Sequence, residues 1–312
     1  MDISIVIVSW NTREILRNCL DSIYKNRGDL EMEVIVVDNA SGDRSAEMVR
    51  EDFKDAIVIA NRDNKGFAAG NNQGIAIARG EWILLLNSDT VVLGDALQKT
   101  LVYARANPRA GVVGCRILNV DMSLQRSCFK FPSILNMSLS ASYLYKVFGR
   151  SRFFGRERMT WWDFNEARLV DCVCGAFMLI RSAAIQEVGL MDEGFFMYAE
   201  ETDYCWRFSR ARWEIRFCPD GEIIHLGGQS SAKVRGPMVI QLRLSILRFI
   251  RKHYGRGSYW MACLLVGIFF AARLPYWWAV KVFDKHRSSQ AQVLLEAYTS
   301  GISRALGGSA SN

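Results

Sequence analysis

The N-terminal part of the chain alternates short apolar runs with segments whose apolar positions recur three and four residues apart. Each apolar run is rich in β-branched residues, which is typical of a parallel strand buried on both faces. Strands are predicted at Ile3–Ser9, Glu33–Asp38, Ala56–Ala60 and Glu81–Leu86. The intervening spacing predicts helices. This alternation indicates an α/β fold with a doubly wound, mainly parallel sheet and flanking helices.

The middle of the chain is less regular. A further strand is predicted to begin near Val112, and Val170–Ile180 and Ile215–Cys218 each have the composition of one strand. A helix is predicted to begin near Ala199, and Ser127–Gly155 is predicted to consist mainly of loops. We expect these segments to complete the same domain.

Polar residues stand where the predicted strands end. Ligands of such sheets bind beyond the carboxyl ends of the strands, so these residues are candidates for a binding site. They are Ser9, Asp38, the loop from Asn61 through Asn64 and Lys65, and the tripeptide Asn87-Ser88-Asp89. The first turn, which contains Asn11, has no glycine. The glycine-rich turn of nicotinamide and flavin enzymes is therefore missing, which disfavours a dinucleotide enzyme.

Two of these carboxylates allow a structural interpretation as well. Asp38 could accept hydrogen bonds from a nucleotide base or ribose, or could close an Asx turn. Asp89 could hold Mg²⁺ or Mn²⁺ on a diphosphate, or could cap the following helix. The glycines from Gly66 to Gly74 are spaced by four, which favours close helix packing over a phosphate loop. Both readings stay open for the two acids.

Three acids occur in Glu200-Glu201-Thr202-Asp203, among aromatic residues. Acids in the first helical turn are favourable caps. A carboxylate in a partly apolar pocket could instead serve as a general base. On a helix Glu200 and Asp203 share a face and Glu201 is rotated away by ~100°. One glutamate could thus face substrate while Asp203 bonds to structure.

Two further positions are candidates for the site. Gly175 would allow another group to approach the predicted strand closely. His225 follows an apolar pair at the end of the body and is either structural or a metal ligand.

Composition limits the class of protein. Half of the residues are apolar and 23% are charged, which excludes disorder and collagen-like repeats. Eight cysteines without CxxC spacing, and a start without the basic flank and apolar stretch of a signal peptide, predict reduced thiols in a cytosolic protein. From Leu226 to Asn312 there are twelve Lys or Arg and two acids, whereas the preceding residues carry 27 basic and 30 acidic side chains. The basic excess therefore belongs to the C-terminal tail.

The tail also carries the longest apolar run. Ser258–Ala272 is uncharged and ends at Arg273, and Leu274–Val280 follows with a proline and two tryptophans. About 20 apolar residues are needed to span a bilayer. We therefore expect a helical hairpin or interfacial pair at a membrane surface rather than a nucleic-acid partner. The alternative is a buried helix that packs on the body or on a second copy in a homodimer.

Taken together, the motifs resemble glycosyltransferase family 2, with a GT-A fold, and more narrowly its rhamnosyltransferase-like branch. They are VSWN, VVDNAS, NKGFAAGNNQG, LLLNSDT, CGAFMLIR, GLMDEGFFMYAEETDYCWR and a later histidine, and they cover roughly Ile3 to Gly228. The resemblance implies residues 1–228 as catalytic domain, with a nucleotide-sugar half of about 1–115 and an acceptor half of about 116–228. Residues 229–312 would be the basic, membrane-associating helical tail.

The resemblance also implies roles for single residues. Asp38 would hold the nucleotide base or ribose, with Asn11 and Asn64 nearby. Asp89 matches the last acid of the family's metal motif, where Asn87 replaces the first, and His225 matches its metal-binding histidine. Mg²⁺ or Mn²⁺ would be the cofactor. In the acid pair that ends in the catalytic base, Glu201 stands at the base position after Glu200, and either could reach the acceptor.

The function implied is an inverting glycosyltransferase that moves a sugar from a nucleotide diphospho-sugar to a lipid-linked or polysaccharide acceptor. The expected donor is dTDP-L-rhamnose, with a UDP-sugar as alternative, at the cytoplasmic face of the cell membrane. A nucleotidyltransferase would need a first loop richer in glycine and arginine than one with Arg13 alone. A non-catalytic nucleotide-sugar scaffold would not need Asp89, Glu201 and His225 together.

Overall fold

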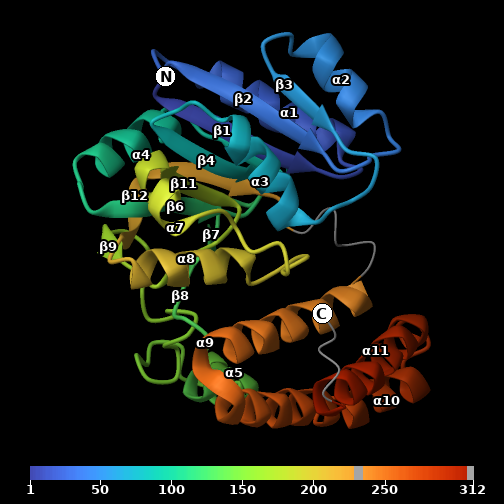
Figure 1. The fold of residues 1–312 in the computed structure, drawn as a ribbon. Coiled ribbons are helices and arrows are strands. Elements are labelled where there is room, and N and C mark those ends of the chain that lie inside the picture. Colours follow the sequence, from blue (N-terminus) through green and yellow to red (C-terminus); the bar gives the residue numbers. More distant parts are fainter. Residues whose placement is uncertain (228–234, 308–312) are drawn as a thin grey trace. The chain divides into compact units, whose positions relative to one another are not determined.

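The computed structural model describes residues 1–227 and 235–307, which belong to two compact units (Figure 1). The N-terminal unit comprises Met1–Phe131, Trp162–Phe196 and Glu200–Ser230. The C-terminal unit comprises Pro132–Trp161, Met197–Ala199 and Ser231–Asn312. The predicted domain boundary at 228–229 lies outside the described residues.

The strands and helices follow one another along the whole described chain. The strands are β1 (Ile3–Ser9), β2 (Met32–Asp38), β3 (Ile57–Ala60), β4 (Trp82–Asn87), β5 (Thr90–Val92), β6 (Ala110–Leu118), β7 (Leu124–Gln125), β8 (Cys128–Phe129), β9 (Arg168–Leu169), β10 (Cys172–Val173), β11 (Phe177–Arg181) and β12 (Glu214–His225). The helices are α1 (Arg13–Lys25), α2 (Ser45–Asp52), α3 (Phe67–Ile77), α4 (Ala96–Arg105), α5 (Ile134–Ser142), α6 (Leu144–Val147), α7 (Ser182–Val188), α8 (Glu200–Arg210), α9 (Arg235–Ala271), α10 (Leu274–Phe283) and α11 (Ser288–Leu306).

The main sheet of the N-terminal unit has the order β3-β2-β1-β4-β11-β6-β12-β5. Its first four strands are parallel, and β11 runs antiparallel to both β4 and β6, so the sheet is mixed. The four strands predicted at the start of the chain agree with β1 to β4 within one residue at each end. The predicted α/β fold with flanking helices is confirmed.

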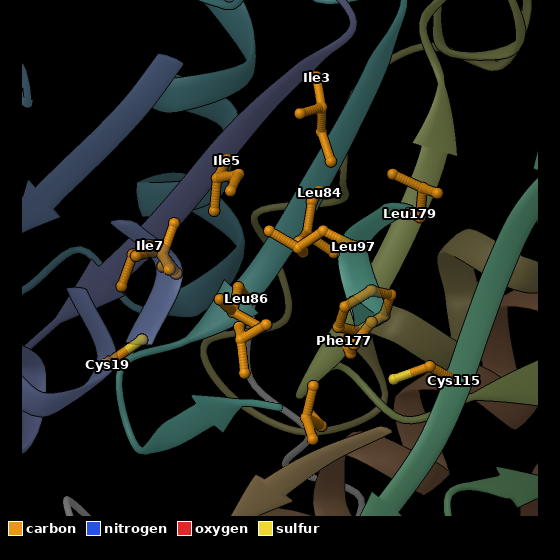
Figure 2. Close-up of a cluster of buried hydrophobic side chains, with 14 of the residues drawn as sticks. Ile3, Ile5, Ile7, Cys19, Leu84, Leu86, Leu97, Cys115, Phe177 and Leu179 are labelled. Atoms are coloured by element: carbon orange, nitrogen blue, oxygen red, sulfur yellow. The ribbon is translucent and has the colours of Figure 1, made fainter. Parts of the chain in front are cut away.

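One face of this sheet packs on α1, α2 and α4. The odd-numbered side chains of β1 point to this face because side chains alternate along a strand. Figure 2 shows Ile3, Ile5 and Ile7 beside Leu84 and Leu86 of the neighbouring strand, all almost fully buried. This apolar layer fixes the strands whose ends carry the candidate site.

The glycine stripe of α3 packs against the opposite face of β1. A Cβ atom at Gly74 would lie 2.3 Å from Cγ1 of Val6, and one at Gly70 would lie 2.9 Å from Cγ1 of Val8. Real Cβ atoms do not come this close, so only glycine lets the helix approach. The interpretation of the glycine spacing as close packing is confirmed.

Two predictions of local structure are wrong. Residues Val170–Ile180 do not form one strand, because β10 leaves the main sheet and pairs with β8 in a separate two-stranded sheet. The chain turns between β10 and β11, where the amide of Cys174 donates to the carbonyl of Ser127 at 2.7 Å. The predicted loop Ser127–Gly155 contains β8, α5 and α6, and α5 is capped by Ser133, whose Oγ accepts from the amide of Asn136.

The described part of the C-terminal unit contains the helices α5, α6, α9, α10 and α11. Gly255, at a φ of 83°, interrupts α9, and this left-handed backbone is strained for residues other than glycine. Gly301 of α11 faces Phe270 of α9 so closely that a Cβ would lie 2.6 Å from its Cε2. The tail is therefore a packed set of helices, longer than the predicted apolar hairpin.

Candidate functional site

Polar residues at three strand ends lie together because the strands are parallel and in register. Ser9 of β1 pairs with Asp38 of β2, and Val8 of β1 pairs with Asn87 of β4. The three ends therefore meet at one edge of the sheet, where the fold class places ligands. The sequence analysis named all three polar residues for this reason.

The first turn is held by its own side chains. Ser9 and Thr12 hydroxyls lie 3.0 Å apart, and the hydroxyl of Thr12 is 3.3 Å from that of Ser88. Asn11 has a φ of 53°, and its Oδ1 accepts from the amide of Gly42 at 2.8 Å. Asn11 thus ties the first turn to the loop that follows Asp38 at the end of β2.

Asp38 is buried and only half satisfied. Its Oδ2 accepts from the amide of Ser41 at 3.0 Å, which is the Asx turn considered from the sequence. Its Oδ1 is buried and has no hydrogen-bond partner. A buried carboxylate oxygen without a donor is unfavourable. Asp38 can therefore close a turn and still accept a hydrogen bond from a ligand.

The loop before α3 contributes Asn64 and Lys65. The Oδ1 of Asn64 accepts from the amide of Gly66 at 3.0 Å, and Lys65 is exposed. Gly66 has a φ of 86°, and a Cβ there would lie 2.6 Å from the carbonyl oxygen of Phe196. The close approach at Gly66 thus fixes the loop. Asn64 is engaged within the loop, whereas the ammonium group of Lys65 is exposed to solvent.

Asp89 and His225 come together where β12 pairs with β5. His225 lies opposite Thr90 in this pairing, and its Nε2 is 3.2 Å from Oδ1 of Asp89. The side-chain amide of Asn87 is 3.4 Å from the same ring nitrogen. The three candidates at the end of β4 and β12 therefore form one cluster.

Gln125 sets the orientation and the tautomer of the His225 imidazole. Its Nε2 donates to Oδ1 of Asn119 and to the carbonyl of His225, so its Oε1 faces the ring. The Nδ1 of His225 lies 2.6 Å from that oxygen and must donate to it. In a neutral ring Nε2 then presents a lone pair toward Asp89. Gln125 was not among the residues predicted, since nothing in its local sequence distinguishes β7.

This donor set fits a divalent cation that also binds a ligand. A lone pair and a carboxylate oxygen facing each other repel unless a proton or a cation lies between them. Among the described residues no group of three or more His, Cys, Asp or Glu side chains gathers as a metal site. Mg²⁺ characteristically takes one or two protein ligands and completes its shell with phosphate oxygens and waters. The pair therefore suits a metal held jointly with a diphosphate.

The acids of α8 face the same region. The pKa of Cys174 is raised to about 12, first by burial and also by the negative charges of Glu201, Asp89 and Glu200. These three carboxylates are therefore close enough to act on one thiol. Burial, and then the charge of Glu201, raise the pKa of Glu200 well above its usual range. Its Oε2 is buried without a hydrogen-bond partner.

Gly175 and Asp203 have different surroundings near the two glutamates. A Cβ at Gly175 would lie 3.6 Å from the ring of Phe67 and 3.7 Å from Cβ of Glu201, which is ordinary contact. Asp203 is fully buried and accepts from Nε of Arg207 at 2.9 Å. The same guanidinium donates to the carbonyls of Val188 and Leu190, so Asp203 fastens α8 to the preceding loop.

Comparison with known proteins identifies the family. A model described as "Glycosyl transferase family 2" matches residues 4–189. The chain belongs to this family. It is 26% identical over 213 residues to N-acetylglucosaminyl-diphospho-decaprenol L-rhamnosyltransferase of Mycobacterium tuberculosis, covering 65% of this chain and 69% of that protein. It is 24% identical over 231 residues to rhamnosyltransferase WbbL of Escherichia coli, covering 71% of this chain and 82% of that protein.

The fold agrees with the family. Mannosyltransferase PcManGT from Pyrobaculum calidifontis, solved in complex with GDP-Man and Mn²⁺, superposes with a TM-score of 0.58 at 15% identity. The match covers 98% of this chain and 87% of that one. The predicted resemblance to the GT-A fold and to the rhamnosyltransferase-like branch is confirmed. The protein is a glycosyltransferase that acts on nucleotide sugars in glycan synthesis.

Proposed function

We propose that this glycosyltransferase transfers L-rhamnose from dTDP-L-rhamnose, with inversion, to a lipid-linked or polysaccharide acceptor. Two relatives named as rhamnosyltransferases support the sugar, and the name of one of them contains a diphospho-decaprenol acceptor. The observation that carries the proposal is that the end of β4 and the acids of α8 meet at one turn. The amide of Asn87 donates to the carbonyl of Ala176 at 3.1 Å, and a Cβ at Gly175 would lie 3.7 Å from Cβ of Glu201, while Asp89 lies 3.2 Å from His225. In a displacement at the sugar carbon, an acid of α8 would deprotonate the acceptor hydroxyl. Asp89 and His225 would serve the leaving diphosphate oxygen.

The donor would lie along the carboxyl edge of the sheet. The unpaired Oδ1 of Asp38 would accept a hydrogen bond from the base or ribose, with Ser9, Asn11 and Asn64 shaping the surroundings. Lys65, which is exposed, would meet phosphate charge. The nucleotide end of the donor is thus assigned to the β1 and β2 side of the site.

The leaving diphosphate would lie at Asp89 and His225, with Asn87 beside them. These two side chains would hold Mg²⁺ or Mn²⁺, and a divalent ion there would neutralise charge on the leaving oxygen. Gln125 would keep the imidazole in the tautomer that leaves Nε2 free for a ligand. This chain contributes orientation and negative charge.

Glu201 would remove the proton of the acceptor hydroxyl. In an inverting displacement the base acts on the face opposite the leaving group. The raised pKa of Glu200 favours the protonated form, which would donate a hydrogen bond to a neighbour or to the acceptor. Gly175 would leave room for the acceptor beside Glu201, and Asp203 would hold the helix in position.

Membrane association is the second part of the proposal. The segment Met238–Phe283 is long and apolar enough to cross a membrane, by length and composition alone. Trp260, Leu264 and Ile268 are spaced by four on α9, and each is at least half exposed. With the basic excess of the tail, this supports attachment to an anionic surface at the cytoplasmic face of the cell membrane.

One screen tests the donor. Thermal stability is measured with dTDP-L-rhamnose, a UDP-sugar and a GDP-sugar, each with Mn²⁺ and with chelator. A ligand at 100 times its dissociation constant adds ~2.7 kcal/mol to the stability of the folded state. We expect the largest shift with dTDP-L-rhamnose and Mn²⁺, followed by transfer to a lipid-linked acceptor. A larger shift with the UDP-sugar would replace the donor, and binding without transfer to any acceptor would favour a non-catalytic scaffold.

A further inference from the structure

Two arginines of the C-terminal unit stack on one aromatic ring. The guanidinium carbon of Arg273 is 3.5 Å from the ring centroid of Phe269, and that of Arg243 is 3.9 Å from it. Arg273 also lies 4.8 Å from the ring of Tyr143, at the junction of α5 and α6. The two positive charges are thus held close together by the packing of α9 on the α5 segment.

Two further cations join them through tyrosine rings. Lys146 of α6 lies with its Nζ 4.9 Å from the ring of Tyr143, and Arg158 lies 5.2 Å from the ring of Tyr145. The two tyrosine rings are stacked, with centroids 6.0 Å apart. We call Lys146, Arg158, Arg243 and Arg273 the basic cluster. All four belong to the C-terminal unit.

The positive charge of the basic cluster is not matched by carboxylates. Within residues 1–227 and 235–307 none of its members forms an ion pair with an acid. The acid that acts electrostatically on Arg243 is Glu157. Burial raises the pKa of Glu157, while Ser140 and the charges of Arg158 and Arg243 act in the opposite direction. Glu157 thus acts on two of the four cations, Arg158 and Arg243, without an ion pair to either.

The guanidinium donors are also incompletely used. The Nη1 of Arg273 donates to the carbonyl of Phe269, but its Nη2 is buried without a partner. The Nε of Arg243 is buried and unpaired as well. Buried donors of charged groups are costly to leave unsatisfied, and native proteins rarely do so. An anionic hydrogen-bond acceptor would satisfy the unpaired donors of Arg243 and Arg273 and would also balance the positive charge of the basic cluster.

The surroundings indicate what carries the anion. Arg243 and Arg273 both lie in the apolar segment Met238–Phe283, whose exposed side chains include Trp260 and Trp278. Arginine is the side chain best suited to phosphate, because its planar fork matches two oxygens at once. Basic pockets between apolar helices are typical of sites for lipid headgroups.

We propose that the basic cluster binds a phosphate or diphosphate group, presented at the end of a lipid chain. This inference rests on the proposed function, whose acceptor is lipid-linked, and names residues of the C-terminal unit that would hold its phosphate without any donor sugar. Free inorganic phosphate would satisfy the same donors but would gain nothing from the apolar helices. A lipid phosphate and free inorganic phosphate thus offer the same oxygens to the basic cluster. The hydrocarbon chain distinguishes the two ligands.

The test uses the full-length protein and measures binding by titration calorimetry. The probes are dodecyl phosphate in neutral phosphatidylcholine vesicles, the same vesicles without it, and inorganic phosphate. We expect Arg243→Gln combined with Arg273→Gln to weaken binding of dodecyl phosphate at least about tenfold, because hydrogen bonds to charged groups are lost. Arg251→Gln is the matched control, since Arg251 lies exposed on the same helix, and it should bind as wild type does.

Equal affinity of the double variant and the wild type would overturn the proposal. Inorganic phosphate binding as tightly as dodecyl phosphate would retain the anion site and reject the lipid chain. Should the double variant fail to fold, Arg273→Gln alone is measured in the same titration, and an unchanged affinity would likewise overturn the proposal. None of these outcomes depends on transferase activity, so the proposed function is tested separately.

Discussion

The Nε2 of His225 lies 3.2 Å from Oδ1 of Asp89, and Gln125 holds the opposite ring nitrogen at 2.6 Å. The pairing of β12 with β5 brings the two ends of this contact together from distant parts of the chain. Because Gln125 accepts from Nδ1, the Nε2 of a neutral ring carries its lone pair on the side of the carboxylate and of the Asn87 amide. This arrangement links the proposed metal ligand His225 to the residue that orients it.

Replacing Gln125 by Leu should therefore weaken metal binding without touching a ligand. The loss of a partner that orients a ligating histidine typically costs about 10–100-fold in metal affinity. Mn²⁺ affinity in the presence of the nucleotide, measured by calorimetry, checks this. Gln98→Leu is the control, since Gln98 donates to loop carbonyls of Asn26 and Arg27. Equal Mn²⁺ affinity of Gln125→Leu and wild type would mean that the tautomer is irrelevant.

Asp89→Ala should abolish metal-dependent binding of the donor, because it removes the charged ligand from a site with few protein ligands. Binding of dTDP with and without Mn²⁺ is the measurement. Asp95→Ala serves as control, because Asp95 is an exposed acid paired with Lys99 at 3.0 Å. The assignment of the metal to Asp89 is wrong if Asp89→Ala keeps a Mn²⁺-dependent affinity for dTDP.

Much of the sheet and the donor edge could be predicted, because both depend on local patterns. Buried parallel strands are continuous apolar runs, and each such run ends where a polar residue follows. Ser9, Asp38 and Asn87 were therefore found without knowledge of the register, and the register then brought them together. The spacing of Gly70 and Gly74 was equally informative, since only close packing on β1 requires it.

What escaped prediction depends on contacts between distant segments. Gln125 lies in a two-residue strand whose role arises only when β7 meets β6 and β12 approaches. The break near Gly175 follows from the pairing of β10 with β8, which no local pattern reveals. Arg273 was taken as the end of an apolar run, whereas it stacks on Phe269 beside Arg243. The hydrophobic periodicity of a segment predicts the type of one helix or strand. It does not predict contacts between segments that are distant in the sequence.

The exposed apolar stripe of α9 should govern binding to vesicles. Leu264→Glu combined with Ile268→Glu places two charges where apolar side chains would enter the lipid, so cosedimentation with anionic vesicles should fall about tenfold or more. Val102→Glu is the control, because Val102 is 68% exposed in the N-terminal unit. Unchanged cosedimentation would reject this face. A change from dimer to monomer without lipid would indicate that a second copy covers the stripe.

Glu200 should make stability depend on pH in a defined direction. Burial raises its pKa above the ordinary value of 4.5, so the folded state binds more protons than the unfolded state between the two values. Stability must therefore fall as the pH rises from the ordinary pKa through the raised one. Glu200→Gln removes this loss, so the variant should match wild type near pH 4 and exceed it above neutrality. Urea denaturation across the pH range measures the difference.

The control for this measurement is Glu47→Gln, since Glu47 is exposed on α2. It should reproduce the pH dependence of the wild type. If Glu200→Gln also keeps that dependence unchanged, Glu200 is ionised in the folded protein and cannot be the neutral member of the acid pair.

The two glutamates of α8 should separate in catalysis. Glu201→Gln keeps size and hydrogen bonding but cannot take a proton, so transfer should fall at least ~10²–10⁴-fold with donor and metal affinity near wild type. Glu200→Gln should cost less, because a protonated carboxyl and an amide both donate hydrogen bonds. Transfer rates at saturating donor decide between them. An inactive Glu200→Gln beside an active Glu201→Gln would move the base by one residue, and activity of both would leave the acids as a cap of α8.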